Sequence, residues 1–187
     1  MDHTIYDENG VAEGLPQEVR YAPVVRIFHW IVAIMVLAVW PLGMVIKFIA
    51  EDDKMTFYLL HESFGFLIFW IMLARLAIRL VRGAPAHPPL PLWQKRIADT
   101  VHVLLYVALI AMPVFGFLAT NAFGFPLDLF GVIPIPDPVG KNEALAGIFM
   151  TIHVTLGYAI LVLFALHMGG ILQHHVLKRD GTLYRMT

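Results

Sequence analysis

The sequence contains no cysteine and a single serine, Ser63, among its 187 residues. The absence of cysteine excludes disulfides, zinc–thiolate sites and iron–sulfur clusters. With one serine in the whole chain, a Ser/His/Asp catalytic triad has no well-placed nucleophile. Histidine occurs nine times and is therefore the obvious soft ligand that the chain can offer.

The chain also carries few charges for its size. Charged residues make up 14% and hydrophobic residues 59%, and the mean hydropathy is +0.73. Soluble domains average about 45–50% apolar and about 25% charged residues, so this chain has more apolar surface than one small core can bury. We therefore expect a lipid bilayer as its solvent. The formal net charge of −1 gives no basic field, which argues against a nucleic-acid partner.

Four apolar stretches are each long enough to cross about 30 Å of hydrocarbon, a distance that takes about 20 helical residues. They predict an all-α protein, an integral membrane four-helix bundle. The expected spans are Val24–Phe48, Phe57–Val81, Arg96–Ala119 and Ala146–Leu172.

The segments outside the spans predict one tail and two long connections. Residues 1–20 are polar and acidic, and they predict a flexible cytoplasmic tail ahead of a single membrane domain, residues 21–187. The run RGAPAHPPLPLWQK predicts an extended surface connection, because its prolines exclude a helix. The run NAFGFPLDLFGVIPIPDPVGKNEAL, rich in glycine and proline, predicts a cap over the bundle end and not a fifth span.

The basic residues indicate the direction of the bundle. Ten lie on the side of the termini and the middle connection, and three lie on the other side. Because lysine and arginine accumulate on the cytoplasmic side, both termini are expected to be cytoplasmic. The ten are Arg20, Arg26, Arg75, Arg79, Arg82, Lys95, Arg96, Lys178, Arg179 and Arg185, and the three are Lys47, Lys54 and Lys141.

Five histidines fall inside the expected spans, where ionisable side chains are rare and often functional. From the direction of each span, His29 and His102 lie near the inner surface, and His61 and His153 near the outer one. Fourteen residues separate His153 from His167. At a rise of about 1.5 Å per residue, His167 lies about 21 Å deeper than His153. At about 100° per residue, the rotation between them is about 40° short of four full turns, so both rings point to the same side of the helix. One helix thus presents a histidine at each of two levels, although a satisfied packing role is the alternative for any single ring.

Two opposed imidazoles at each level suit haem b, whose iron takes two axial nitrogens within an apolar disc. Without cysteine, thiolate ligation and covalent attachment through Cys-x-x-Cys-His are excluded. A di-metal carboxylate site is disfavoured because only Glu62 lies close to a span interior.

Small residues near the histidines would let a helix approach a haem closely, and tight helix packing explains these residues equally well. These are Gly65, Gly157, Gly169 and Gly170.

Four stretches of the sequence resemble the bacterial cytochrome b561 family of membrane di-haem cytochromes b. They are IFHWIV, LLHESFGFLIFWIMLARLAIRL, VHVLLYVALIAMPVFGF and LHMGGILQHHVLKRDGTLYRM, one from each span in order. The resemblance extends from Tyr21 to Met186 and implies a bacterial inner-membrane protein with two b haems between its helices. The cytochrome b subunits of nickel–iron hydrogenases and formate dehydrogenases share this general plan.

The resemblance also implies ligand roles for four histidines. His29 and His167 would bind the inner haem iron, and His61 and His153 the outer one. Depth alone cannot choose between His29 and His102 for the inner level, so that choice depends on the family.

His102 is then a spare histidine on the inner level. We expect it to line a quinone or proton site, or else to bind a haem propionate or a backbone group. Arg75 and Arg79 lie four residues apart on one helix face. Together with Arg26, they are expected either to pair with the haem propionates or to reach lipid head groups.

Two haems about 20 Å apart along a bundle would carry electrons across a membrane. Members of the family move electrons between an outer donor and the quinone pool, and the best-defined bacterial relatives resemble superoxide:ubiquinone oxidoreductases. The resemblance therefore favours superoxide oxidation on the periplasmic side coupled to ubiquinone reduction.

The charges of the outer segments favour an alternative donor. Three lysines face seven acidic residues, a net charge of −4, which gives no positive funnel for an anion. An acidic outer face suits a basic periplasmic redox protein, such as a small cytochrome. The acidic residues are Glu51, Asp52, Asp53, Glu62, Asp128, Asp137 and Glu143.

A third interpretation is a structural membrane anchor whose histidines bind nothing.

Overall fold

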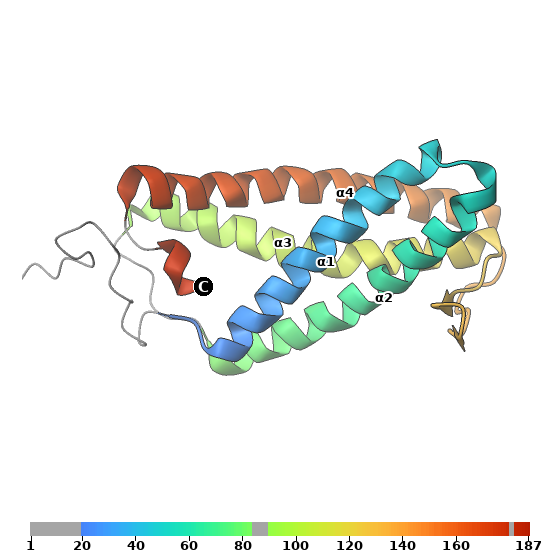
Figure 1. Cartoon of the computed structure of the whole chain (residues 1–187), viewed down its shortest axis with the longest axis horizontal. Helices are drawn as coiled ribbons and strands as arrows, with labels where there is room; N and C mark the ends of the chain where they lie inside the picture. The colour runs from blue at the N-terminus through green and yellow to red at the C-terminus, as the bar shows by residue number, and fades with distance from the viewer. Residues whose placement is uncertain (1–19, 84–89, 180–181) are drawn as a thin grey trace, which may run out of the picture.

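The computed structural model describes residues 20–83, 90–179 and 182–187. Its framework is four long helices, each of the length and apolar composition of a membrane span (Figure 1). The predicted all-α framework is therefore confirmed, with four long apolar helices that are candidate membrane spans. The tail expected over residues 1–20 lies outside the described residues except for residue 20, and so do residues 84–89 of the proline-rich connection.

The first two helices form a hairpin. Helix α1 spans Pro23–Val45 and continues into the 3-10 turn η2, Ile46–Phe48, before α2 spans Glu51–Arg82. Helix α2 begins earlier than the expected Phe57, because its first turn consists of acidic residues that hydropathy assigns to a loop. Carboxylates are stabilised there by the positive end of the helix dipole.

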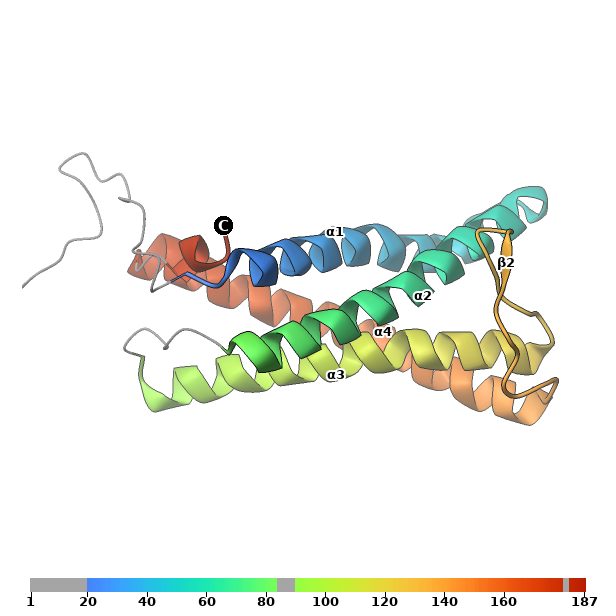
Figure 2. The ribbon, with the colours of Figure 1, turned by 90° about the horizontal axis from the view of Figure 1, so that it is seen from below.

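The last two helices form a second hairpin. Helix α3 spans Leu92–Phe123 and ends at Gly124, which has a left-handed φ of 91°. Helix α4 spans Glu143–Leu172 and continues as a π-helical turn, η3, over Gln173–Lys178. The start of α3 falls inside the predicted extended connection, which is therefore shorter than expected. Helix α3 packs along α4, α1 packs against α2, and α2 joins the hairpins by packing against α3 (Figures 1 and 2).

The connection between α3 and α4 contains a small antiparallel hairpin, β1 (Asp128–Leu129) and β2 (Ile133–Pro134). Figure 2 shows it reaching from the α3–α4 end across to α2. The Phe130 amide donates to Ser63 Oγ at 2.8 Å, and the Phe130 ring packs edge-on against Phe64. Residues 124–142 are fully described and contain no helix, which confirms that this segment is not a fifth span. The α2 residues that the hairpin contacts, Ser63 and Phe64, follow His61 closely along the chain.

At the opposite end, the last described residues fold back against the start of α1. The 3-10 turn η4, Thr182–Arg185, lies there, and the Tyr21 amide donates to the Arg185 carbonyl at 3.1 Å. Trp30 Nε1 donates to the Met186 carbonyl at 2.8 Å. The start of α1 and the last described residues are therefore held together at the end of the bundle that carries His29.

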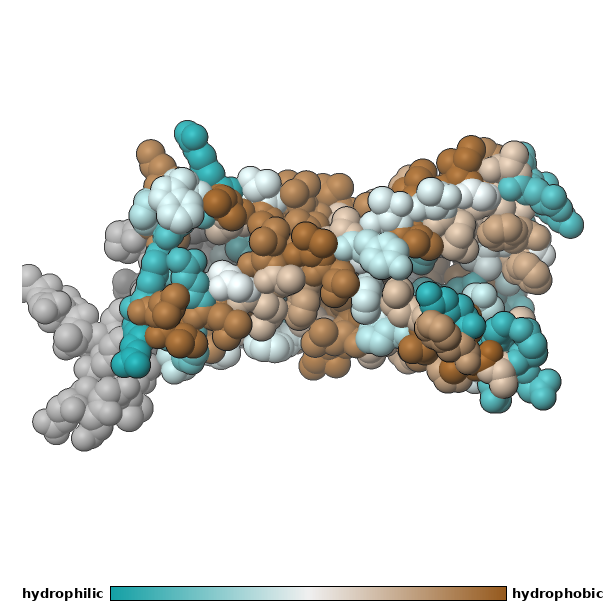
Figure 3. Space-filling view, turned by 90° about the horizontal axis from the view of Figure 1, so that it is seen from above, coloured by the Kyte–Doolittle hydropathy of each residue, from teal (hydrophilic) through white to brown (hydrophobic). Residues whose placement is uncertain are grey.

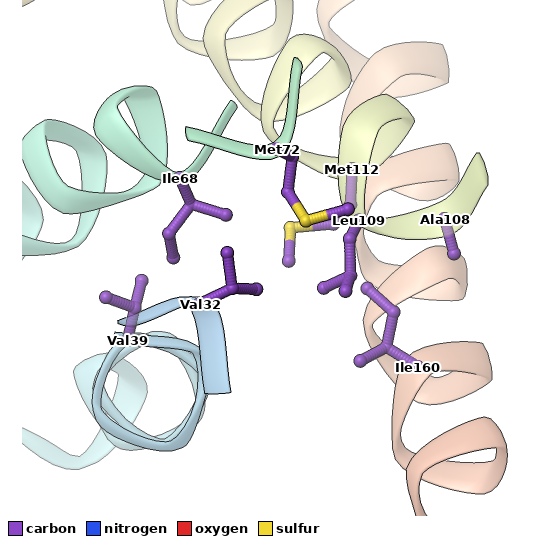
Figure 4. Packing of buried hydrophobic residues seen from close by; sticks show 8 residues of the cluster. All are labelled: Val32, Val39, Ile68, Met72, Ala108, Leu109, Met112 and Ile160. Carbon is purple, nitrogen blue, oxygen red and sulfur yellow. The ribbon is translucent and has the colours of Figure 1, made fainter. Parts of the chain in front are cut away.

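The buried apolar core lies between the two histidine levels. Met72 is fully buried at its centre (Figure 4). Elsewhere large apolar side chains face outward, and the face drawn in Figure 3 is largely hydrophobic over the middle of the molecule, with polar groups at both ends. Such a surface suits a lipid environment. The core residues are Val32, Val39, Ile68, Met72, Ala108, Leu109, Met112 and Ile160.

Candidate functional site

At the level predicted to be the outer one, His61 on α2 and His153 on α4 have ring centroids 6.0 Å apart and planes at 89°. His61 Nδ1 lies 3.0 Å from the Val39 carbonyl oxygen on α1. His153 Nδ1 lies 2.9 Å from the Met112 carbonyl oxygen on α3. Each outer histidine is thus tied to the other helix of its own hairpin.

These two contacts determine the tautomer of the outer histidines. A carbonyl oxygen can only accept a hydrogen bond, so Nδ1 of His61 and of His153 is the donor and carries the proton. The lone pair of each neutral ring therefore lies on Nε2. This is the arrangement in which a second-shell carbonyl orients a histidine as a metal ligand.

At the level predicted to be the inner one, His29 on α1 and His167 on α4 have ring centroids 6.3 Å apart and planes at 65°. His102 on α3 lies even closer to His167, at 5.3 Å. The structure therefore brings together the expected inner pair and places the spare histidine against it. Among the described residues, three imidazoles thus gather at this level and two at the other.

The spacing within both expected pairs fits a bis-imidazole iron centre. Metal–nitrogen bonds to imidazole are about 2.0 Å long, and with about 1.1 Å from each nitrogen to its ring centre, a collinear pair has centroids about 6.2 Å apart. The 6.0 Å and 6.3 Å separations agree with this value, whereas His102 and His167 are closer than it allows. No described residues form a group of three or more histidine, cysteine or acidic side chains suited to a metal ion.

Arginine side chains surround the inner level. Arg75 Nη2 lies 2.9 Å from His29 Nδ1, and its guanidinium stacks over the Tyr106 ring. Because arginine only donates, His29 Nδ1 is the acceptor in this contact. Binding of iron by His29 through Nε2 requires a proton on Nδ1 instead, and therefore requires Arg75 to turn to another acceptor.

The other two predicted arginines have partners at the inner edge of the bundle. Arg79 donates to the Gly83 carbonyl at 3.0 Å and lies over the Tyr21 ring, and Arg26 donates to the carbonyl oxygen of Thr187. Within the described part of the chain, the Nε atoms of Arg26 and Arg75 are buried without a hydrogen-bond partner. Donors of this kind are available to a carboxylate such as a haem propionate, and that role stays a prediction.

The glycines singled out from the sequence do not contact the histidines. A Cβ on Gly65 would meet nothing within 4 Å, and one on Gly157 would approach only Trp40 Nε1, at 3.8 Å. Two other glycines do lie against histidine rings, Gly43 beside His61 and Gly116 beside His153. Sequence reasoning missed them because they lie on helices other than those of the histidines that they contact. One sequence feature could have identified them: a proline followed closely by a glycine recurs toward the outer ends of the first and third spans.

Comparison with known proteins shows one consistent likeness. Residues 20–187 match the model of the prokaryotic cytochrome b561 family. The chain is 30% identical over 172 residues to "Cytochrome b561 homolog 2" of Escherichia coli (strain K12), covering 89% of this chain and 90% of that protein. It is 28% identical over 173 residues to "Cytochrome b561 homolog 1" of the same organism, covering 89% and 96%. It is also 28% identical over 161 residues to "Probable superoxide oxidase CybB" of Yersinia pestis, covering 84% and 90%.

Proposed function

This chain belongs to the prokaryotic cytochrome b561 family, and we propose that it carries electrons across the bacterial inner membrane through two b haems. The family supports haem b as the cofactor. The number of haems is inferred from one observation, two histidine pairs at bis-imidazole spacing, His29 with His167 and His61 with His153. Both pairs lie between apolar helices, as a hydrophobic macrocycle requires.

The chain contributes ligation, spacing and a dry interior, and haem b when bound supplies one-electron chemistry at its iron. The Val39 and Met112 carbonyls hold His61 and His153 through Nδ1, which leaves Nε2 of each ring as the nitrogen that would bind iron. The buried apolar core around Met72 separates the two levels and excludes water between them. These features support an electron path along the bundle axis.

We further propose that the reaction is superoxide oxidation at the outer end coupled to ubiquinone reduction at the inner end. Each superoxide loses one electron and leaves as dioxygen. Two such electrons and two protons convert one ubiquinone into ubiquinol. The relative from Yersinia pestis named as a probable superoxide oxidase supports this assignment.

The inner third histidine supports a quinone site at that end. His102 is not needed for either expected pair, and its ring lies 5.3 Å from that of His167. An imidazole can donate a hydrogen bond to a quinone carbonyl oxygen, and the guanidinium groups of Arg75 and Arg79 provide positive charge on the same level. We propose that the quinone ring binds against His102.

Stopped-flow mixing of superoxide with the oxidised protein tests the donor. Haem reduction close to the diffusion limit, with ubiquinol formed at half the number of superoxide molecules consumed, supports superoxide oxidation. Slow reduction that ionic strength does not change counts against it, because steering of an anion depends on salt.

The acidic outer end favours a second candidate donor, a basic periplasmic redox protein. Glu51, Asp52 and Asp53 form the exposed first turn of α2, close to the outer histidine level. A reduced cationic cytochrome mixed with the protein should transfer electrons faster at low salt than at high salt. Replacing these three residues with their amides should slow that reaction and should not slow the reaction with superoxide.

An absorption spectrum tests haem binding itself. Purified protein without a Soret band, and without an α-band on reduction, would leave a structural membrane anchor as the function.

The absence of cysteine makes the orientation of the chain in the membrane easy to measure. A cysteine introduced at Val132, an exposed residue of the outer hairpin, should react with an impermeant maleimide added outside intact cells, and one at Thr187 should not.

A further inference from the structure

The two outer histidines are seated in two equivalent places. On α1, the Val39 carbonyl contacts His61 Nδ1, and Gly43 lies four residues further along the helix. On α3, the Met112 carbonyl contacts His153 Nδ1, and Gly116 again lies four residues further along. We call each pair of carbonyl and glycine an outer socket.

The glycine of each outer socket is required by space. A Cβ on Gly43 would lie 2.5 Å from His61 Cε1 and 3.0 Å from its Nδ1. A Cβ on Gly116 would lie 2.8 Å from His153 Nδ1 and 2.9 Å from its Cε1. Both contacts are too short for any side chain larger than hydrogen, so an alanine must push the ring away from its carbonyl.

The two outer sockets have related sequences, VWPLG at residues 39–43 and MPVFG at residues 112–116. Each places a proline inside its helix, Pro41 in α1 and Pro113 in α3. Proline lacks an N–H and distorts the regular carbonyl pattern of a helix. The repetition in two hairpins indicates a built feature and not a single accidental contact.

The inner level has no such arrangement. Among the residues that the structure describes, no backbone carbonyl contacts a ring nitrogen of His29 or His167, and the group nearest His29 Nδ1 is the Arg75 guanidinium at 2.9 Å. The two levels therefore differ in charge as well as in hydrogen bonding. A carbonyl accepts a hydrogen bond from the ring, whereas Arg75, which gives up its bond to Nδ1 when His29 binds iron, offers the inner level only its positive charge.

This difference changes the redox balance of an iron bound at each level. Donation from Nδ1–H to a carbonyl makes the imidazole a stronger base and so favours ferric iron. A positive charge near the site favours ferrous iron, which carries one charge less. The outer iron is therefore expected to be the weaker oxidant.

We propose that the outer sockets, Val39 with Gly43 and Met112 with Gly116, position the two outer ligands and hold the outer haem at a lower potential than the inner haem. An electron entering at the outer end then moves downhill to the inner end. Gly43 and Gly116 are positioning residues, because they act through His61 and His153. The inference depends on the proposed two-haem function.

Redox titration of Gly43→Ala and Gly116→Ala, followed by absorbance and electron paramagnetic resonance, tests the proposal. Each variant should lose one haem of two, or show one of its two potentials raised together with an altered low-spin signal, while the other haem is unchanged. Gly147→Ala is the matched control, since a Cβ there meets nothing within 4 Å, and it should match the parent. Two haems with parental potentials and signals in both variants would overturn the role of the glycines.

The unaltered protein provides a measurement that does not depend on the folding of any variant. Its titration should resolve two one-electron waves, and coincident waves would overturn the potential difference. If the variants bind both haems, the titration wave that they shift should be the one at lower potential. A shift of the wave at higher potential would overturn the assignment of the lower potential to the outer haem. A protein that binds no haem at all would instead contradict the proposed function.

Discussion

Trp40 on α1 donates its indole N–H to the Gly157 carbonyl on α4 at 3.0 Å. This bond joins the two hairpins between the outer and inner histidine levels. It links α1 with α4 directly, in addition to the packing of α2 against α3. Trp40 is therefore a direct link between the halves that does not depend on a cofactor.

Replacing Trp40 with phenylalanine removes the donor and keeps most of the apolar bulk. We expect the loss of one part-buried hydrogen bond to cost about 0.5–1.5 kcal/mol, with both haems still bound. Thermal loss of the Soret band in detergent measures the effect. Trp93→Phe, an exposed position in the first turn of α3, is the control. Equal melting of the two variants would contradict the linking role of Trp40.

Substituting the two histidines of α4 separately should separate the two haems. His153→Ala should lose the outer haem and keep the inner one, and His167→Ala should do the reverse, because each removes one ligand of a different pair. The haem-to-protein ratio and the low-spin resonance signals measure the outcome. Loss of the same haem in both variants would show that the pairs are assigned wrongly.

Replacing His102 with alanine should leave both haems bound and slow quinol formation severalfold, since the proposed quinone contact is lost. Turnover with a soluble ubiquinone analogue measures the rate, and a spectrum checks the haem content. Val103→Ala, the exposed neighbour on α3, is the control. If His102→Ala instead loses the inner haem, His102 is the ligand and His29 is not.

The contact between Ser63 and the outer hairpin should stabilise the cap. Ser63→Ala leaves the Phe130 amide without its acceptor, at a cost of about 1 kcal/mol, and should make residues 124–142 more accessible. The rate of tryptic cleavage at Lys141 measures this change. Thr155→Ala removes an exposed hydroxyl that bonds only within α4 and should cleave at the parental rate. Identical cleavage of both variants would exclude a role for Ser63 in holding the hairpin.

The spans and histidine levels could be predicted because both depend on position along one helix. Hydropathy locates a helix in lipid, and the rise per residue places His153 and His167 at opposite levels. Helix ends were predicted less well. The first turn of α2 is charged, so Glu51 resembles a loop residue although it begins the helix.

Relations between helices could not be obtained in this way. Depth counting places His29 and His102 on one level, and only the packing shows that His167 lies 6.3 Å from one ring and 5.3 Å from the other. Gly43 and Gly116 were missed for the same reason. Their importance depends on which ring of a neighbouring helix they face, and a single sequence does not contain that information.

The distribution of the histidines over the two hairpins also affects how the protein is made. The α1–α2 hairpin contains one member of each proposed pair, His29 and His61, and α4 contains both remaining members. During synthesis, the α1–α2 hairpin therefore emerges first with one ligand of each proposed pair, and the second ligand of each pair follows only with α4. Neither haem can gain both of its proposed ligands before residues 153 and 167 have been synthesised, so the cofactors can join the two hairpins only after the fourth helix has been made.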